Sequence, residues 1–155
     1  MSAPLPLLLS LALLLLLPAY ASILNFGLMI TRVVRRSPFS YVYYGCHCGL
    51  GGRGIPVDDT DWCCHSHDCC FESLIISGCD PYKKSYKFSY SNNNLLCSPW
   101  NLNECARKTC ECDRAAALCF KRHKKSYSIW NYGIRKTHRC DQPTPACDFT
   151  QLPIH

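Results

Sequence analysis

The chain has 155 residues, 14 of them cysteines, and a formal net charge of +6 at pH 7. A chain of this length has room for one compact domain but not for two. A high and even number of cysteines is typical of small secreted scaffolds and argues against a reducing compartment. We therefore expect seven disulfides in an oxidising environment, and the positive charge favours anionic partners.

The N-terminus is an apolar run, LPLLLSLALLLLLPAYAS, that ends in AYA at residues 19–21. Signal peptidase cuts after such a small-x-small pattern, so we predict a signal peptide at residues 1–21 and a secreted, extracellular protein that begins at Ser22. No basic residue precedes the run, because the first charged residue is Arg32, and an uncleaved membrane anchor is the alternative. The flanking prolines and the short uninterrupted apolar core, residues 11–17, weigh against an anchor.

The next segment, ILNFGLMITRVV, predicts an amphipathic helix, because Ile23, Phe26, Gly27 and Ile30 recur at helical spacing. One interpretation is a helix that packs on the core. The other is an apolar rim that touches lipid, which the arginines after it would favour on an anionic surface. The sequence alone leaves both open.

A glycine-rich loop, YVYYGCHCGLGGRGIPV, follows at residues 41–57. Closely spaced glycines let the backbone curl until several carbonyls face one centre. Carbonyls with a nearby carboxylate are the oxygen ligands that calcium prefers. The glycines alone are equally compatible with a phosphate-binding nest or with plain turns.

The stretch DWCCHSHDCC, residues 61–70, falls in a helix predicted from about Pro56 to Ile75, with three aspartates at its N-terminal end: Asp58, Asp59 and Asp61. On a helix, adjacent cysteines point about 100° apart, so each CC pair reaches two partners rather than one ion. His65 and His67 lie two residues apart, on nearly opposite sides. We therefore favour disulfides over a zinc site.

The rest of the chain predicts a hairpin, a helix and an irregular end. SYKFSYSNNNLL, residues 85–96, alternates and then turns at residues 92–94, as a short β-hairpin does. A second long helix is predicted over residues 103–124, with a basic end that suits the helix dipole. Residues 126–155 are expected to be irregular and anchored by cysteines.

Three motifs in this order, YGCHCGLGGRG, DWCCHSHDCC and CECDRAAALC, resemble secreted phospholipase A2 of the group II type. The resemblance covers nearly all of residues 22–155, which it identifies as a phospholipase A2-like domain. It implies a mainly α, disulfide-rich fold with two long antiparallel disulfide-bridged helices, an N-terminal amphipathic helix, a calcium-binding loop and a small β-wing. The implied activity is calcium-dependent hydrolysis of the sn-2 ester of glycerophospholipids at membrane interfaces, which gives a free fatty acid and a lysophospholipid.

The resemblance also implies a disulfide pairing in which Cys147 is bridged and the first helix has no cysteine, as in group II. Cys63 and Cys70 lie seven residues apart, and so do their implied partners on the other helix, which requires antiparallel helices. His67 lies between those two cysteines and projects toward the partner helix. The implied pairs are Cys46–Cys140, Cys48–Cys64, Cys63–Cys119, Cys69–Cys147, Cys70–Cys112, Cys79–Cys105 and Cys97–Cys110.

By resemblance, His67 is the general base that removes a proton from a water attacking the ester carbonyl. Asp113 accepts from the other ring nitrogen, and Tyr86 supports that aspartate. An ordinary imidazole, with a pKa of about 6.5, offers a neutral base at extracellular pH. His65 is expected to be solvated or supporting. Phe71 departs from the family, which has a tyrosine there, and we expect a modest loss of stability or activity from it.

The resemblance places calcium between the backbone carbonyls of His47, Gly49 and Gly51 and the carboxylate of Asp68. Calcium would act as a Lewis acid on the phosphate and on the developing oxyanion, helped by the backbone N–H of Gly49. A second departure is the segment RVVRRSPFSYVYY, residues 32–44, which lacks the glycine turn usual in the family.

We expect phospholipid membranes, anionic ones in particular, as the partner, with heparin-like glycans or a receptor as further candidates. We expect no nucleic acid partner and a monomeric protein. Trp62 is either a core residue or one that inserts at the headgroups. The acyl channel and its rim are expected to use Ile23, Leu24, Phe26, Met29 and Ile30. Positive potential is expected from Arg32, Arg35, Arg36, Arg53, Lys121, Arg122, Lys124, Lys125, Arg135, Lys136 and Arg139.

Two other functions remain open. One is a membrane- or receptor-binding relative on the same scaffold that has lost catalysis, and the other is a cationic antimicrobial protein without hydrolysis. A binding relative typically lacks the calcium carboxylate, whereas this chain has Asp68 beside His67 and Asp113. The sequence therefore favours the enzyme.

Overall fold

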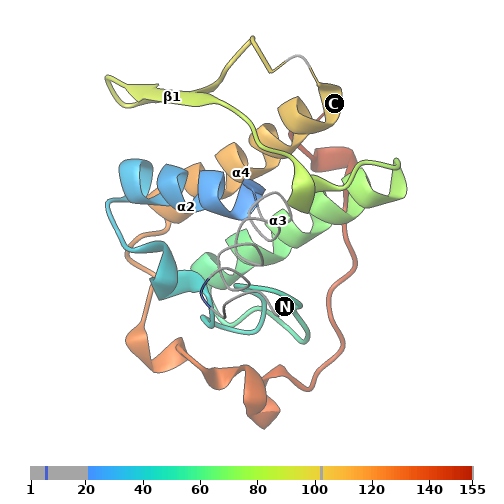
Figure 1. The fold of residues 1–155 in the computed structure, drawn as a ribbon. Coiled ribbons are helices and arrows are strands. Elements are labelled where there is room, and N and C mark those ends of the chain that lie inside the picture. Colours follow the sequence, from blue (N-terminus) through green and yellow to red (C-terminus); the bar gives the residue numbers. More distant parts are fainter. Residues whose placement is uncertain (1–5, 7–20, 102, 155) are drawn as a thin grey trace.

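The computed structural model describes residue 6, residues 21–101 and residues 103–154, and the predicted signal peptide lies almost wholly outside these residues. In the part described, no helix is both long and apolar enough to cross a membrane. From residue 21 to residue 154, three helices and one hairpin are described, joined by loops and short 3-10 turns (Figure 1). The helices are α2 (Ala21–Val34), α3 (Asp59–Ile76) and α4 (Glu104–Arg122), and the strands are β1 (Phe88–Ser91) and β2 (Asn94–Cys97).

Helices α3 and α4 form the centre of the fold and run antiparallel, as predicted (Figure 1). Each helix begins just after a capping side chain: Asp58 accepts from the third backbone N–H of its helix, and Asn103 does the same for α4. These caps explain why α3 starts three residues later than the predicted Pro56.

Helix α2 packs across α4 and contributes to the main core. Its buried face carries Met29, Ile30, Val33 and Val34, whereas Leu24 and Leu28 on the other side are more than half exposed. The core-packing interpretation of this helix is therefore confirmed, whereas contact of its exposed apolar side chains with lipid stays a prediction.

The β-wing is a two-stranded antiparallel hairpin in which Phe88 pairs with Cys97 and Ser91 with Asn94. Asn92 and Asn93 both have positive φ, 48° and 65°, as a two-residue hairpin turn requires. The turn therefore occupies the first two of the three predicted positions, and Asn94 already belongs to β2.

All fourteen cysteines form disulfides, and the seven pairs are those that the resemblance implies. The pairs Cys63–Cys119 and Cys70–Cys112 join α3 to α4 at two levels. The segment after α4 runs round the outside of the molecule, past the loop before α3, and is tied back by Cys46–Cys140 and Cys69–Cys147 (Figure 1). As predicted, this segment has no long helix or strand, although it makes several 3-10 turns.

Candidate active site

The site is built on the facing sides of α3 and α4, where His67 meets Asp113. His67 Nε2 donates to Asp113 Oδ1 at 2.5 Å. The aspartate side chain is fully buried, whereas that of His67 is 14% exposed. Because Asp113 occupies Nε2, the other ring nitrogen, Nδ1, is the one left to accept a proton.

Asp113 has a second partner, because its Oδ2 accepts from the hydroxyl of Tyr86. Burial raises the pKa of the Asp113 carboxyl, whereas the hydrogen bonds from His67 and Tyr86 favour the charged form. Burial, together with the nearby aspartate, raises the pKa of Tyr86, so its hydroxyl stays protonated and keeps donating. The structure thus brings together three of the predicted site residues, and both carboxylate oxygens of the aspartate are occupied.

Two phenylalanines flank the imidazole of His67. The ring of Phe26, from α2, stacks on it with centroids 4.7 Å apart. The ring centroid of Phe71, one turn later on α3, lies 4.3 Å from that of the imidazole. The Phe71 ring also meets the ring of Tyr82 edge-on, with centroids 5.3 Å apart. The phenylalanine that departs from the family is therefore a buried packing partner of the histidine, although it offers Asp113 no hydroxyl.

A cavity of about 270 Å³ opens beside His67. Its walls include Ile23, Phe26 and Ile30, three of the five residues predicted for the acyl channel. Of the other two, Met29 is fully buried in the core and does not line the cavity, whereas Leu24 is exposed and its place on the rim stays a prediction. The complete lining is Ser22, Ile23, Phe26, Gly27, Ile30, Pro38, Tyr41, Val42, His47, Cys48, Gly49, Leu50, Cys64, His67, Asp68, Phe71, Tyr82, Asp113 and Phe120.

The glycine-rich loop before α3 has two kinds of backbone carbonyl. Three alternate carbonyls accept hydrogen bonds from the protein. The carbonyl of Cys46 accepts from the backbone N–H of Arg53 at 3.2 Å. Those of Cys48 and Leu50 accept from the guanidinium of Arg135, at 2.5 and 2.7 Å.

The carbonyls that alternate with these three, those of His47, Gly49 and Gly51, are the ones predicted to bind calcium. No residue of the described chain donates a hydrogen bond to the carbonyl oxygens of His47, Gly49 or Gly51. The carboxylate of Asp68, 39% exposed, lies 3.6 Å from Nδ1 of His47. His47, Gly49 and Asp68 all line the cavity. Unengaged backbone oxygens and one carboxylate are the donor set that suits calcium, so these residues fit the ion.

Side chains alone would not make a metal site here. Among the described residues, no three His, Cys, Asp or Glu side chains are grouped as a metal centre would require. A cation in this cavity would therefore depend on the backbone of the loop. Gly49 has a φ of +100°, and a Cβ there would lie 2.9 Å from the carbonyl carbon of Val42, so the loop needs glycine at this position.

The loop is held from the inside by Asp61, a role that the sequence did not reveal. Its fully buried carboxylate accepts from the backbone N–H groups of Cys46 at 2.7 Å, His47 at 2.8 Å and Val57 at 3.0 Å. We predicted only an acidic residue at the helix N-terminus, which describes Asp58 and Asp59 better. A Cβ on Gly45 would occupy the place of this carboxylate, so the glycine before the first loop cysteine makes room for Asp61.

His65 lies outside the cavity, in keeping with a supporting position. Its Nε2 is 2.9 Å from the carbonyl of Pro145, and its ring meets that of His47 edge-on at 4.9 Å. Trp62, 42% exposed, lies with its ring edge-on to His65 at 5.3 Å, so it belongs neither wholly to the core nor to the surface.

Comparison with known proteins shows the family of the chain. A sequence profile of the Phospholipase A2 family matches residues 23–132. The chain is 48% identical to a rat protein named phospholipase A2, membrane associated, over 127 residues, which are 81% of this chain and 86% of the relative. It is 44% identical to the human group IIE secretory phospholipase A2 over 126 residues, 81% of this chain and 87% of the relative. The chain belongs to the phospholipase A2 family.

Proposed function

We propose that this protein is a secreted, calcium-dependent phospholipase A2 that hydrolyses the sn-2 ester of glycerophospholipids at membrane surfaces. One observation carries the proposal: the His67–Asp113 pair lines the same apolar cavity as Asp68 and as His47 and Gly49, two of the loop residues with unengaged carbonyls. The names of the relatives, several of them secretory phospholipases, support secretion and this activity.

In this mechanism, Nδ1 of His67 accepts a proton from a water that attacks the ester carbonyl. Asp113, fixed by Tyr86, keeps the ring oriented and stabilises the imidazolium that forms. The backbone N–H of Gly49 is proposed to donate to the developing oxyanion. The carbonyls of His47, Gly49 and Gly51 and the carboxylate of Asp68 would hold calcium, which would supply Lewis-acid polarisation of the phosphate and the ester.

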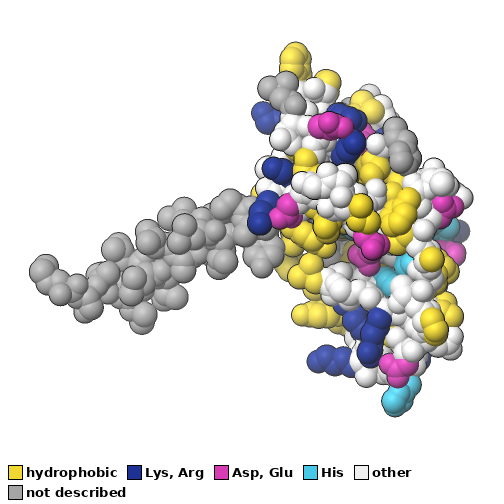
Figure 2. Space-filling model, turned by 90° about the vertical axis from the view of Figure 1, so that its right-hand side faces the viewer, with side chains coloured by type: hydrophobic (Ala, Val, Ile, Leu, Met, Phe, Trp, Pro, Cys, Tyr) yellow, Lys and Arg dark blue, Asp and Glu magenta, His cyan; other side chains and the backbone are white. Residues whose placement is uncertain are grey.

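The proposed partner is an anionic phospholipid surface. Ile23 and Leu24 on α2 are 41% and 58% exposed, and Leu50 on the loop is 66% exposed. Ile23 and Leu50 line the cavity, so exposed apolar side chains lie at its edge. Figure 2 shows hydrophobic side chains across the middle of one face, with Lys and Arg above and below them. Each basic side chain near an anionic surface adds about 1 kcal/mol to binding before screening. A monomer, no nucleic acid partner, and glycans or a receptor as further partners stay predictions.

The calcium site is tested by replacing its proposed carboxylate. Asp68→Asn should weaken calcium binding, measured by calorimetry, and lower fatty-acid release from anionic vesicles at limiting calcium, each by at least about tenfold. The matched control is Asp59→Asn, since Asp59 is 65% exposed and pairs with His123 outside the cavity. Release that continues unchanged in a chelator would contradict calcium dependence.

The presence of Phe71 favours a second candidate, a binding relative without catalysis. Phe71 has no hydroxyl, so it cannot donate to Asp113 the hydrogen bond that the family's tyrosine would. The two functions differ in one measurement. A binding relative would associate with the vesicles and release no fatty acid at any calcium concentration.

A further inference from the structure

We propose that Arg135 is a positioning residue for calcium. Its guanidinium holds the carbonyls of Cys48 and Leu50 from outside the loop, and so leaves the carbonyls between and beside them free for the metal. The inference rests on the calcium site proposed above and adds a residue from the C-terminal segment to it.

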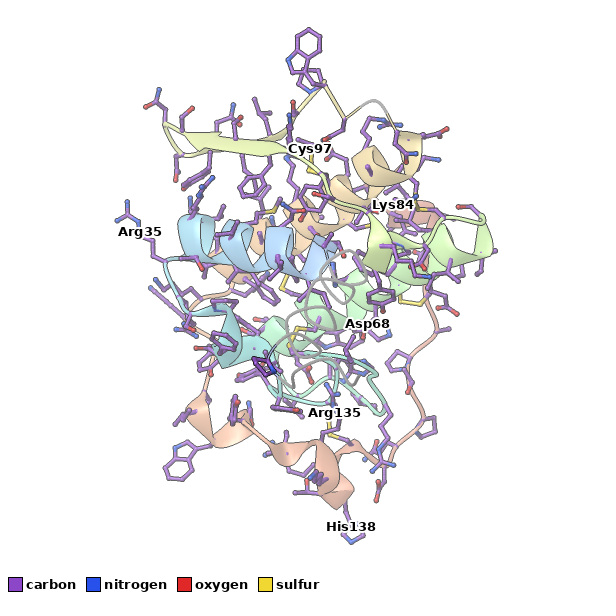
Figure 3. All side chains as sticks on the ribbon, in the orientation of Figure 1. Arg35, Asp68, Lys84, Cys97, Arg135 and His138 are labelled. Atoms are coloured by element: carbon purple, nitrogen blue, oxygen red, sulfur yellow. A yellow bond between two sulfur atoms is a disulfide. The ribbon has the colours of Figure 1, made fainter. Side chains whose placement is uncertain are left out.

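The contact uses both ends of the guanidinium. Nη2 donates to the carbonyl of Cys48 at 2.5 Å and Nη1 to that of Leu50 at 2.7 Å, whereas the buried Nε has no hydrogen-bond partner among the described residues. A planar, rigid fork can bind two carbonyls in one fixed geometry. Figure 3 shows the loop between the labelled Asp68 on α3 and Arg135 on the C-terminal segment.

The segment that presents Arg135 is itself fixed to the start of the loop. The backbone N–H of Gly133 donates to the carbonyl of Tyr43 at 2.7 Å, and that of Gly45 donates to the carbonyl of Asn131 at 2.8 Å. The disulfide Cys46–Cys140 closes the same region. The guanidinium is therefore held in place by its own backbone as well as by the loop.

This contact gives Arg135 a role other than the one expected from the sequence, which is to supply positive potential. The electrostatic effect of a cation beside a calcium site is repulsion, so neutralising Arg135 should strengthen calcium binding if charge alone mattered. If Arg135 positions the loop, neutralising it should weaken binding instead. The two roles predict opposite signs.

The test is calorimetric titration of calcium into the disulfide-bonded protein and three variants, with fatty-acid release measured alongside. Arg135→Met should raise the Kd for calcium about tenfold, since residues that orient metal ligands typically matter to this extent. The Kd of Arg135→Lys should lie between those of the unmodified protein and Arg135→Met, because one ammonium group cannot bind two carbonyls as the guanidinium does. Lys136→Met, the matched control, removes the same charge from an exposed neighbouring residue and should leave the Kd unchanged or slightly lower. At saturating calcium, release by Arg135→Met should return to within about twofold of the unmodified protein.

An unchanged or lower Kd in Arg135→Met would overturn the inference while leaving the calcium site itself intact. If Arg135→Met does not fold, Arg135→Lys carries the same comparison, and a Kd equal to that of the unmodified protein would count against positioning. Absence of calcium binding in the unmodified protein would overturn the proposed function and this inference with it.

Discussion

Nε2 of His67 on α3 lies 2.5 Å from Oδ1 of Asp113 on α4. On either side of this pair a disulfide joins the same two helices. The ring and the carboxylate therefore need little reorganisation to act together, because the helices that carry them cannot slide past each other. Preorganisation of this kind lowers the cost of orienting a base during the reaction.

Replacing Phe71 with tyrosine should change fatty-acid release by less than about fivefold. The added hydroxyl offers Asp113 one neutral hydrogen bond, worth about 1 kcal/mol, and both carboxylate oxygens already have a partner. Initial rates on anionic vesicles at saturating calcium measure the effect. A gain above about a hundredfold would instead show that Phe71 holds the natural protein nearly inactive.

Replacing Asp61 with asparagine should destabilise the protein by about 2–3 kcal/mol. The amide would turn its NH₂ group toward backbone N–H donors that the carboxylate now satisfies, in a site with no access to water. Guanidinium unfolding of the disulfide-bonded protein measures the change. Asp59→Asn is the control on the exposed side of the same helix turn, and an equal cost in both variants would refute a special role for Asp61.

Replacing Arg35 with glycine should stabilise the protein by about 1 kcal/mol. Arg35 follows the last residue of α2 with a φ of +55°, a conformation that costs a residue with a Cβ but not glycine. Arg35→Ala removes the same charge and keeps the Cβ, so thermal or guanidinium unfolding should show a gain only for glycine.

The stability of the protein should fall at alkaline pH because of Tyr44. Burial, together with a hydrogen bond to Asp58, raises the pKa of this tyrosine from 10.0 to about 12. Between these values the unfolded chain loses the proton and the folded chain keeps it, so the stabilisation present below pH 10 is lost as pH rises toward 12. The free energy of unfolding should therefore drop by about 1 kcal/mol from pH 9 to pH 11, relative to Tyr44→Phe. Parallel pH curves for the two proteins would contradict the shift.

Much of the fold could be predicted because the decisive signals are local or carried by the cysteines. Acidic residues at the start of α3 and basic residues at the end of α4 mark the two long helices, and adjacent asparagines mark the hairpin, so the predicted positions are correct to within about three residues. The disulfide pairing followed from the resemblance, and with two helices joined at two levels it brings His67 and Asp113 face to face.

The parts that could not be predicted depend on contacts between distant segments. Nothing in the sequence near Asp61 shows that its side chain turns back to the loop, and nothing near Arg135 shows that it reaches Cys48 and Leu50. Met29 is predicted to line the acyl channel but is buried in the core. Helical spacing shows which residues share a face, but not which segment packs against that face. Gly45, just before Cys46, was the one local sign, because a side chain at this position would collide with the carboxylate of Asp61.

The most direct measurement is fatty-acid release from anionic phospholipid vesicles by the disulfide-bonded protein and two histidine variants, with calcium and with chelator. His67→Gln should lower calcium-dependent release at least about a hundredfold without loss of folding, because it removes the proposed base. His65→Gln, two residues away on the same helix and outside the cavity, should keep most of it. Equal release by the two variants, or none from a folded protein that binds the vesicles, would contradict the account.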